Sequence, residues 1–427
     1  MKIQIVVAAS LLAFSSLAQA FAQDSKSFPG TETFIRFNSE VSSNRQAEVL
    51  KHLGLTTLWK SNLVPGLVAV QPTSTELSTK SLTGLRQKLR NLPEILYAEP
   101  NFHIRRDLDP SSFKALPEFR WNESASAPND PYFNRQWALS GSAGINPMEA
   151  WDALAASRTP TEVKVAVIDT GADSAHPDLQ GRILPGHDFI DNTDNVKDTA
   201  SHGTHVSGII AAITGNGTGI AGIASYARII PIRAVPDHGD ETDLNVGKAF
   251  EFAVEQGARV ANCSFGKDQQ SQAVKDIIDA AGQKGLLVVV AAGNDSADNR
   301  NHPSFPVNFH TDNMIGVASI GSNGRLSYFS NYGPGIVDVA APGGRILSTT
   351  PNANYESMDG TSMASPQVAG VAALVLSVVP TLTVEQLKRV LFSSVTTSSP
   401  LRDRVTTGGA INASAAVREA LKLTNSN

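Results

Sequence analysis

The 427-residue sequence predicts an α/β protein with a doubly wound parallel sheet, preceded by a small α+β domain of ferredoxin-like type. Short apolar segments recur after residue 160, and stretches with helical spacing separate them, which predicts parallel strands covered by helices on both faces. Composition then divides the chain, because residues 21–120 carry a net positive charge and residues 121–427 a net negative charge. A chain of this length is expected to form two or three domains, and opposite charges favour docking between them.

The overall composition excludes several classes of protein. The chain is 41% hydrophobic and 18% charged, so it is neither a low-complexity nor a disordered sequence. Its net charge of −5 argues against a nucleic-acid partner. The single cysteine, Cys263, excludes an intramolecular disulfide, and the apolar segment around it predicts a buried, unreactive thiol.

The N-terminus has the pattern of a secretory signal. A lysine at position 2 precedes an apolar run over residues 3–17, and small residues follow it at positions 18–20. We therefore expect a signal peptide over residues 1–20. The alternative is a membrane anchor, but the run is shorter than the roughly 20 residues that span a bilayer, and no later segment is expected to span one. The mature protein is expected to be secreted, free of the membrane and monomeric.

The first domain is expected over residues 21–106. Its pattern predicts a β-α-β-α-β order, with strands at 33–37, 67–70 and 95–99 and helices at 44–53 and 78–92. That order favours a compact unit of ferredoxin-like type. Residues 107–127 are rich in proline and serine, which predicts an exposed, cleavable linker.

The second domain is expected over residues 128–427. Its predicted parallel strands lie at 163–168, 229–232, 259–262 and 286–290. In a doubly wound sheet the active cleft lies at the carboxyl ends of the strands, so residues that follow these segments are the candidates for a site.

Three polar residues stand where strands end or a helix begins. Asp169 follows a buried strand, Asn294 follows the most apolar strand, and Ser362 precedes an apolar helix predicted at 368–379. A buried carboxylate needs a partner, an amide can donate hydrogen bonds, and a helix N-terminus stabilises negative charge on a nearby oxygen. Each residue alone could also be an ordinary turn or cap residue, and the aspartate could bind a metal or a ribose.

Two histidines begin a helix that is rich in small residues. His202 and His205 are three positions apart, which could suit zinc, but the sequence has no His-Glu-x-x-His motif and no obvious third ligand. We therefore interpret His205 as a packed core histidine and His202 as the candidate for chemistry.

With Asp169, His202, Asn294 and Ser362 in this order, the sequence resembles the subtilisin-like serine proteases, particularly their thermitase-like branch, from about Pro128 to the C-terminus. The resemblance implies that Ser362 is the nucleophile, His202 the general base and acid, Asp169 its orienting carboxylate, and Asn294 a donor to the oxyanion. The Ser362 backbone N–H is implied as the second donor. The implied activity is that of a serine endopeptidase acting on protein or peptide substrates.

The same resemblance implies further parts of the molecule. The first domain is similar to the propeptide of these enzymes, an intramolecular inhibitor and folding assistant, with removal between Arg106 and Pro128. Substrate is implied to lie as an added strand against Ser264, Phe265 and Gly266, with Ala291, Ala292 and Gly293 lining the first specificity pocket. Lys267 departs from the glycine often found at its position. Three acidic residues near the opposite edge predict either a preference for basic substrate residues or a solvated loop; they are Asp240, Glu241 and Asp243.

Calcium is the implied cofactor. The residues that match a calcium site of the family supply carboxylate, amide or backbone carbonyl oxygens, and they are Asp130, Asp178, Ile213, Asn216, Thr218 and Ile220. A second site could use Asp188, Asp191, Thr193 and Asn195. Lys197 stands where an oxygen ligand is expected there, so the alternative is an ordinary acidic turn.

Two other functions remain open on the sequence alone. Residues 217–222 satisfy a dinucleotide-binding fingerprint, with Asp237 and Asp240 about 20 positions on, but the predicted helix before it and strand after it are in the wrong order. The second alternative is a catalytically inactive binding module on the protease fold, which the presence of every reacting group disfavours.

Overall fold

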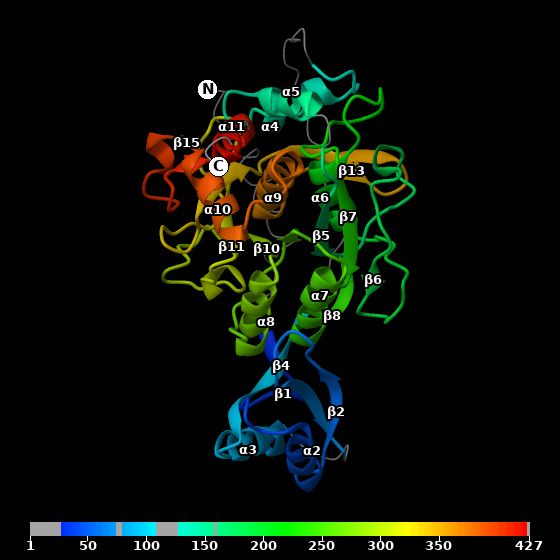
Figure 1. Cartoon of the computed structure of the whole chain (residues 1–427), viewed down its shortest axis with the longest axis vertical. Helices are drawn as coiled ribbons and strands as arrows, with labels where there is room; N and C mark the ends of the chain where they lie inside the picture. The colour runs from blue at the N-terminus through cyan, green and yellow to red at the C-terminus, as the bar shows by residue number, and fades with distance from the viewer. Residues whose placement is uncertain (1–26, 74–78, 108–126, 158–159, 425–427) are drawn as a thin grey trace, which may run out of the picture.

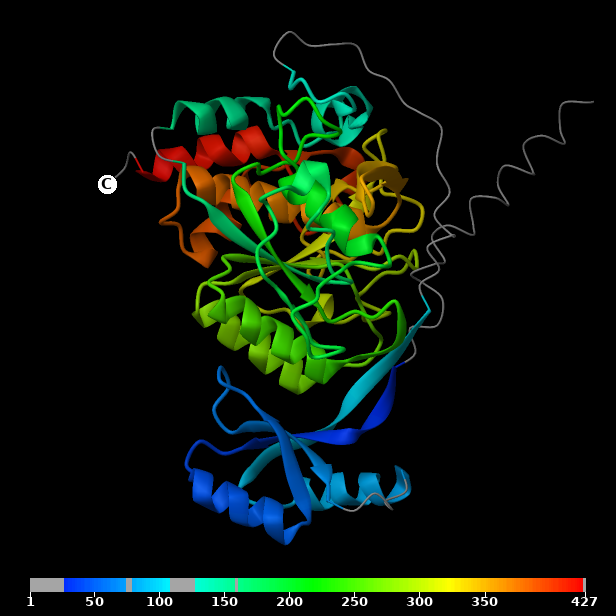
Figure 2. The same cartoon turned by 90° about the vertical axis from the view of Figure 1, so that its right-hand side faces the viewer.

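The computed structural model describes residues 27–73, 79–107, 127–157 and 160–424, which form a small N-terminal unit and a large domain (Figures 1 and 2). The predicted signal peptide and most of the predicted linker lie outside the described residues. The small unit, residues 27–107, lies against one side of the large domain, beneath α7 and α8 in Figure 1.

The small unit is a four-stranded antiparallel sheet with two helices. Its elements are β1 (Ser27–Phe37), α2 (Ser43–His52), β2 (Leu55–Lys60), β3 (Leu67–Pro72), α3 (Thr79–Arg90) and β4 (Ile95–Asp107). The sheet order is β2-β3-β1-β4, and both helices lie on the face that points away from the large domain (Figure 2). The element order is the β-α-β-β-α-β of a ferredoxin-like unit, so that prediction is confirmed.

One strand of this unit was absent from the prediction. The β-α-β-α-β order predicted from the sequence is wrong, because β2 intervenes between the first helix and the second predicted strand. Only Leu55 of β2 is buried, so the segment lacks the alternating apolar pattern by which an edge strand is recognised.

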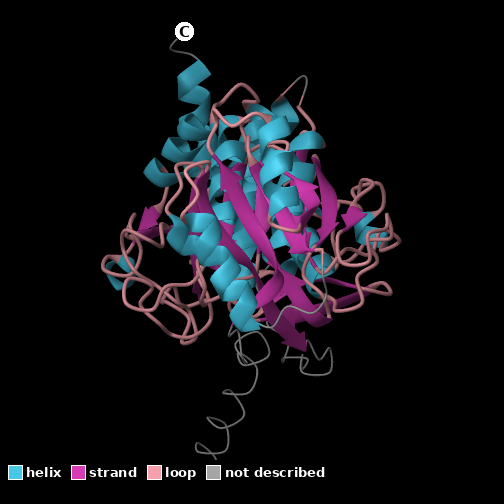
Figure 3. Ribbon diagram, turned by 90° about the horizontal axis from the view of Figure 1, so that it is seen from below, coloured by secondary structure: helices cyan, strands magenta, loops and turns pink. Residues whose placement is uncertain are grey.

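The large domain contains a nine-stranded sheet with helices on both faces (Figure 3). Its strands are β5 (Val163–Asp169), β6 (His187–Asp188), β7 (Ala227–Arg233), β9 (Val260–Cys263), β10 (Leu287–Ala291), β11 (Met314–Ile320), β12 (Val339–Pro342), β15 (Thr396–Thr397) and β16 (Gly409–Ala410). The order is β15-β16-β12-β11-β10-β9-β5-β7-β6, and all neighbours are parallel except β15 and β16. The predicted doubly wound parallel sheet and its four predicted strands are confirmed.

The helices form a layer on each face of this sheet. They are α4 (Trp137–Ser140), α5 (Met148–Ala156), α6 (His202–Ala211), α7 (Asp243–Glu255), α8 (Gln272–Gln283), α9 (Thr361–Val378), α10 (Val384–Ser393) and α11 (Ala413–Thr424). The helices α6 and α9 pack together on one face, and α7 and α8 pack together on the other (Figure 1). A hairpin of β13 (Ile346–Thr350) and β14 (Asn354–Met358) covers α6.

Helix α9 is apolar enough to cross a membrane by length and composition, contrary to the expectation that no later segment would be. Within the protein 94% of this helix is buried. It contacts strands β9 to β12 and helix α6, so it is the central core helix of the large domain.

The two units share a sheet and a hydrophobic cluster. Strand β8 (His238–Thr242) of the large domain pairs antiparallel with β4 and becomes the fifth strand of the small sheet. Phe34, Leu67 and Ala69 on the sheet face pack in one cluster with residues of α7 and α8, among them Phe250 and Ile277. These side chains are fully buried, and their burial stabilises the docked arrangement.

Candidate active site

The predicted reacting groups collect at one edge of the large sheet. Asp169 is the last residue of β5, Ser264 follows β9, and Asn294 lies shortly after β10. These strands are neighbours in the order β10-β9-β5, and they run parallel, so their carboxyl ends meet at the same edge. The chain turns from one side of the sheet to the other beside β5, which is where a doubly wound sheet opens a crevice.

Asp169 and His202 form a buried pair. The imidazole Nδ1 and the Asp169 Oδ1 are 2.7 Å apart, and each side chain is 2% exposed. The carboxylate can only accept, so Nδ1 carries the proton and Nε2 is the basic nitrogen of the neutral ring. Asp169 Oδ1 also accepts the Thr170 N–H at 2.8 Å, which fixes the carboxylate.

Small residues let helix α6 approach the end of β5. A Cβ at Gly203 would collide with the Gly171 carbonyl oxygen, so a larger residue beside His202 would push the helix away. Glycine at this position therefore allows the imidazole to reach Asp169.

A second buried carboxylate, Asp198, caps helix α6, and the sequence prediction missed it. The N-cap residue Ser201 has φ 70° and makes no side-chain cap. Asp198 Oδ2 instead accepts from Thr204 N at 2.8 Å and Thr204 Oγ1 at 2.6 Å, and its Oδ1 accepts from Thr170 Oγ1 at 2.9 Å. Burial raises the pKa of Asp198, while these hydrogen bonds lower it. An aspartate just before a helix start was the available signal.

Ser362 lies in the first turn of α9. The helix begins at Thr361, seven residues before the predicted start at 368, and Pro366 lies inside it. Ser362 is 4% exposed, and its hydroxyl donates to the Ser264 carbonyl oxygen at 3.2 Å. The Ser264 hydroxyl donates in return to the Ser362 carbonyl oxygen at 3.0 Å, so the two segments are joined beside the serine.

Asn294 is held by its carbonyl oxygen. Asn294 Oδ1 accepts from Thr361 N at 2.8 Å and from Thr361 Oγ1 at 2.9 Å. Because the oxygen is occupied by the start of α9, the amide NH2 group is directed to the other side and remains the donor end. Asn294, Thr361 and Ser362 all line the same pocket.

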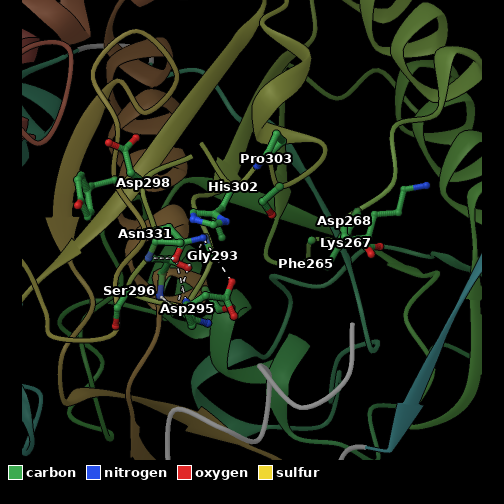
Figure 4. A pocket seen from close by; sticks show the side chains of 18 of the residues that line it. Phe265, Lys267, Asp268, Gly293, Asp295, Ser296, Asp298, His302, Pro303 and Asn331 are labelled. Atoms are coloured by element: carbon green, nitrogen blue, oxygen red, sulfur yellow. Dashed lines mark hydrogen bonds between the residues drawn. The ribbon is translucent and has the colours of Figure 1, made fainter. Parts of the chain in front are cut away.

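This pocket has a volume of about 620 Å³ (Figure 4). Of the predicted substrate-binding residues it is lined by Ser264, Phe265, Gly266, Ala291 and Gly293. Ala292 does not line it: the residue is 0% exposed and its carbonyl oxygen accepts from Asn299 Nδ2 at 2.9 Å. The structure thus places Ala292 away from this pocket, because alternate residues of an extended segment face opposite ways.

Several polar lining residues had no motif by which they could be predicted. They are Lys267, Asp268, Asp295, Ser296, Asp298, Asn301, His302 and Asn331. Figure 4 shows Lys267 and Asp268 across the pocket from Asp295 and Asn331. The pocket is thus a polar cleft that Ser362 and Asn294 help to line.

Two of the acidic residues that could favour basic substrates form pairs with basic side chains in the structure. Asp243 is 4% exposed and lies 2.6 Å from Lys267 Nζ. Asp240 lies 3.3 Å from His103 of the small unit. The charge of Asp243 is already neutralised, so it does not supply a free anionic subsite.

The residues of the predicted calcium site lie together. Asp130 accepts the N–H groups of Gly215 and Asn216, and Asn216 Nδ2 donates to Asp178 Oδ1 at 2.9 Å. Asp178 Oδ2 accepts from Ile220 N at 2.8 Å. Burial raises the pKa of both carboxyl groups.

This calcium-site set fits a hard cation by its chemistry. Asp130 is 4% exposed and Asp178 is 0% exposed, and in the described part of the chain neither is paired with a lysine or arginine. The described residues contain no cluster of three or more His, Cys, Asp or Glu, so carbonyl and amide oxygens would have to complete the coordination. Ile213 and Thr218 belong to the same loop after α6.

The second acidic cluster already contains a cation. Arg233 Nη1 lies 2.7 Å from Asp188 and 3.1 Å from Asp191. A guanidinium between these carboxylates repels a second positive ion, so the alternative of an ordinary acidic turn is favoured over a calcium site with Thr193 and Asn195.

The remaining motifs have structural roles. His205 is 0% exposed, donates to the Ile346 and Glu356 carbonyl oxygens, and has its pKa lowered to about 3 by burial, so the interpretation as a core histidine is confirmed. Cys263 is buried, and burial raises the pKa of its thiol. The glycine-rich segment 217–222 lies in a loop between α6 and β7, so the dinucleotide-binding alternative is wrong in its context.

Comparison with known proteins gives consistent matches. The model of the subtilase family matches residues 161–412. A thermophilic serine proteinase from a Bacillus species is 34% identical over 88% of this chain and 89% of its own length. Thermitase from Thermoactinomyces vulgaris is 43% identical over 58% of this chain and 85% of its own length.

Solved structures agree with these matches. A protease from Pseudoalteromonas arctica aligns with a TM-score of 0.61 at 34% identity, over 69% of this chain and 100% of its own. Fervidolysin from Fervidobacterium pennivorans, described as a keratinolytic enzyme related to subtilisin, aligns with a TM-score of 0.73 at 24% identity. The alignment covers 92% of this chain and 61% of fervidolysin, and it supports the fold described above.

Proposed function

This chain belongs to the subtilase family and is a serine endopeptidase, and we propose that it cleaves peptide bonds with a triad of Asp169, His202 and Ser362. We further propose that it is made as a self-inhibited precursor, is secreted and binds structural calcium. The observation that carries the proposed chemistry is the buried pair of Asp169 and His202 at the same sheet edge as the pocket of Ser362 and Asn294.

The proposed reaction has two halves. The Ser362 oxygen attacks the substrate carbonyl carbon while His202 Nε2 takes the hydroxyl proton, and the C–N bond breaks as the imidazolium returns that proton to the leaving amine. Water then attacks the acyl-enzyme with the same base, releasing the acid and restoring the hydroxyl. Asp169 holds the Nδ1 proton throughout and stabilises the imidazolium.

Asn294 would stabilise the negative charge on the substrate oxygen. Its carbonyl end is held by Thr361, so the NH2 end needs no rearrangement to donate when charge develops. The N–H of Ser362 lies at the N-terminus of α9, where backbone donors have no partner within the helix. Together they would form the oxyanion hole.

The docked small unit supports the proposal of a self-inhibited precursor. The end of β4, residues 103–107, pairs antiparallel with β8 as an extended substrate would. Glu99 accepts from the N–H groups of Gln272 and Ala273 at the start of α8, and Asn101 accepts from Leu244 N at the start of α7. The predicted cleavage between Arg106 and Pro128 would follow this strand, in a segment that lies largely outside the described residues.

Calcium would stabilise the loop after α6 by neutralising Asp130 and Asp178. Binding to the folded state alone raises the free energy of unfolding. We predict that a strong calcium chelator lowers the melting temperature and that added calcium restores it. An Asp178→Asn variant should melt lower and respond less to chelation; unchanged melting with the chelator would contradict the site.

Secretion is proposed from the N-terminal sequence pattern and from a similar protein from Xanthomonas campestris, 37% identical over 69% of this chain, whose name is extracellular protease. Expression of the full chain in a bacterial host tests it, since the mature protein should appear in the medium.

The proposed function is tested by incubating the purified full-length protein with mixed peptides, with and without a serine-directed inhibitor. Sequencing the products and the new N-terminus of the protein should show inhibitor-sensitive cleavage of both. Cleavage that the inhibitor leaves unchanged would contradict the role of Ser362.

A further inference from the structure

A buried asparagine interrupts the apolar face of strand β9. Asn262 is 0% exposed, and its partners in register on the neighbouring strands are Val167 of β5 and Val289 of β10. Both valines belong to the hydrophobic cluster that includes the buried side chains of α9. An amide among valines lowers the stability of the fold unless both of its ends are hydrogen-bonded. Asn262 therefore needs polar partners on this face of the sheet.

Two buried serines bind the two ends of this amide. Ser365 lies on α9 one turn after Ser362, and its hydroxyl donates to Asn262 Oδ1 at 2.7 Å. Asn262 Nδ2 donates to the Ser264 hydroxyl at 2.9 Å, and that hydroxyl donates to the Ser362 carbonyl oxygen at 3.0 Å. Ser264 is 3% exposed and Ser365 is 0% exposed, so water does not compete for these bonds. The result is a chain of hydrogen bonds that begins and ends on α9.

The chemistry of these groups allows only one direction for the chain of hydrogen bonds. A backbone carbonyl oxygen can only accept, so the Ser264 hydroxyl uses its one proton on Ser362 and must accept from the amide nitrogen. The amide oxygen of Asn262 then faces Ser365, whose hydroxyl must donate. Each bond thus fixes the next one, and removal of the Ser365 hydroxyl would leave the amide free to turn.

This chain holds together two segments that line the pocket. Ser264 begins the segment after β9 that is expected to bind the substrate strand, and Ser362 is the proposed nucleophile; both line the pocket. The Ser362 hydroxyl also donates to the Ser264 carbonyl oxygen at 3.2 Å. Neither Asn262 nor Ser365 is among the residues that line the pocket. Any effect of these two residues on the reaction must therefore act through Ser264 and Ser362.

We propose that Asn262 and Ser365 are positioning residues that set the distance between the nucleophile and the substrate-binding segment. The inference rests on the proposed peptidase function and adds two residues to it that do not touch the substrate. Attack on a carbonyl carbon requires the reacting atoms to be held closely, and a displacement of about 1 Å can lower the rate on the order of 100-fold. The chain of hydrogen bonds should therefore support kcat more than substrate binding.

The first variant is Ser365→Ala, which removes one hydroxyl from the interior of a helix and leaves no buried donor unpaired. It should lower kcat by about 10-fold and change KM by less than about threefold, because the amide can turn away from Ser264. Asn262→Val matches the neighbouring valines and removes the whole link, so it should lower kcat by about 100-fold. The double variant should lose no more than Asn262→Val alone, because both side chains act through one chain of bonds.

The measurements use the full-length protein after its own processing is complete. Active sites are counted by titration to completion with a serine-directed fluorophosphonate, so that kcat refers to folded enzyme only. Asn313→Ala is the matched control, because Asn313 is another buried asparagine, 4% exposed, whose Nδ2 donates to the carbonyl oxygens of Ile278 and Leu286. This control should lower the melting temperature and leave kcat per titrated site unchanged.

The outcomes separate the inference from the proposed function. If the unmodified protein cleaves no peptide after processing, the proposed function fails. If it cleaves peptides but Ser365→Ala keeps its kcat per titrated site within about twofold, only the positioning role is wrong. An equal loss of kcat in Asn313→Ala would also overturn that role, because the loss would then follow from weaker packing. If Asn262→Val does not fold, Ser365→Ala decides alone.

Discussion

The catalytic edge and the docking surface under α7 and α8 both bury carboxylates, but they satisfy them from different sources. Asp169 and Asp198 take their partners from β5, α6 and the loop between them, all within the large domain. Glu251 instead accepts the N–H groups of Asn62 and Leu63 in the small unit, at 3.0 and 3.1 Å. The catalytic set is therefore complete without the small unit, whereas the docking surface is not.

This difference would allow the proposed self-inhibited precursor to carry a complete set of reacting groups. Asp276 shows the same dependence as Glu251, since it pairs with Arg36 at 2.5 Å and accepts the Tyr97 hydroxyl at 2.8 Å. Release of the small unit would expose these groups to water, which can replace their partners. It would break no hydrogen bond of the pair formed by Asp169 and His202.

The largest expected effect comes from removing the nucleophile. Ser362→Ala should lower self-processing by at least about 10⁴-fold, as loss of the nucleophile does in subtilisins, because no other group replaces its oxygen. The protein should remain folded with the small unit docked. Gel analysis and N-terminal sequencing of the purified chain measure this, and processing at the normal rate in this variant would show that Ser362 is misassigned.

The second prediction concerns the carboxylate that caps α6. Asp198→Asn should lower kcat by about 10-fold to 100-fold, because an amide places a donor against Thr204 or Thr170 and disturbs the approach of His202 to Asp169. Asp338→Asn is the matched control, because Asp338 is another carboxylate with its pKa raised by burial, away from the pocket. Equal losses of kcat in both variants would show that Asp198 only supports the fold.

The third prediction addresses the docking surface alone. Glu99→Ala removes the acceptor of the α8 N-terminus and should speed release of the small unit by about 10-fold, with the peptidase activity after release unchanged. The lag before activity appears measures release. Glu48→Ala is the control, since Glu48 is an exposed carboxylate of the same unit. If Glu99→Ala also lowered the peptidase activity after release, the docking surface and the catalytic edge would not be independent.

The smallest expected effect is pH dependence at the β4 and β8 edge. The His103 ring donates a hydrogen bond to Glu32 and another to Asp240, and these bonds, the first more than the second, raise the pKa of His103. The docked state favours the protonated His103 ring. The contribution of this ring to docking is therefore fully present below about pH 6.5, the ordinary pKa, and is lost as pH rises through the raised pKa. Of these two carboxylates, only Asp240 belongs to the large domain. Release of the small unit should therefore become faster by a fewfold above the raised pKa of His103.

His103→Gln should remove this pH dependence of release. Glu32, whose pKa is lowered to about 2 chiefly by the hydrogen bond with His103, stays charged over the whole range and serves as a constant background. Release that remains equally steep with pH in the variant would assign the effect to other groups of the interface, such as Glu99.

The sequence predicted those parts of the fold and site that are set locally. Asp169 and His202 were found because one ends an apolar strand and the other begins a helix. Strand β2 was missed because only Leu55 of it is buried, and Asp198 was missed because its partners include Thr170 in a different segment. Local pattern carries no information on such contacts.

The pair of Lys267 and Asp243 lay furthest beyond sequence reasoning. Each residue was noticed, one as a departure from glycine and the other as part of an acidic loop. Their pairing depends on how the segment after β9 and the strand β8 meet across the groove. That arrangement follows from tertiary packing, so the sequence left open whether the acidic residues favour basic substrate residues or form a solvated loop.

The most direct test of the account is a crystal structure of the matured enzyme after reaction with a serine-directed fluorophosphonate. We predict a phosphorus–oxygen bond at Ser362, the phosphonyl oxygen within hydrogen-bond distance of Asn294 Nδ2 and Ser362 N, and His202 Nε2 within about 3.2 Å of the Ser362 oxygen. Labelling of a different residue, or an imidazole beyond hydrogen-bond reach of Ser362, would contradict the proposed triad.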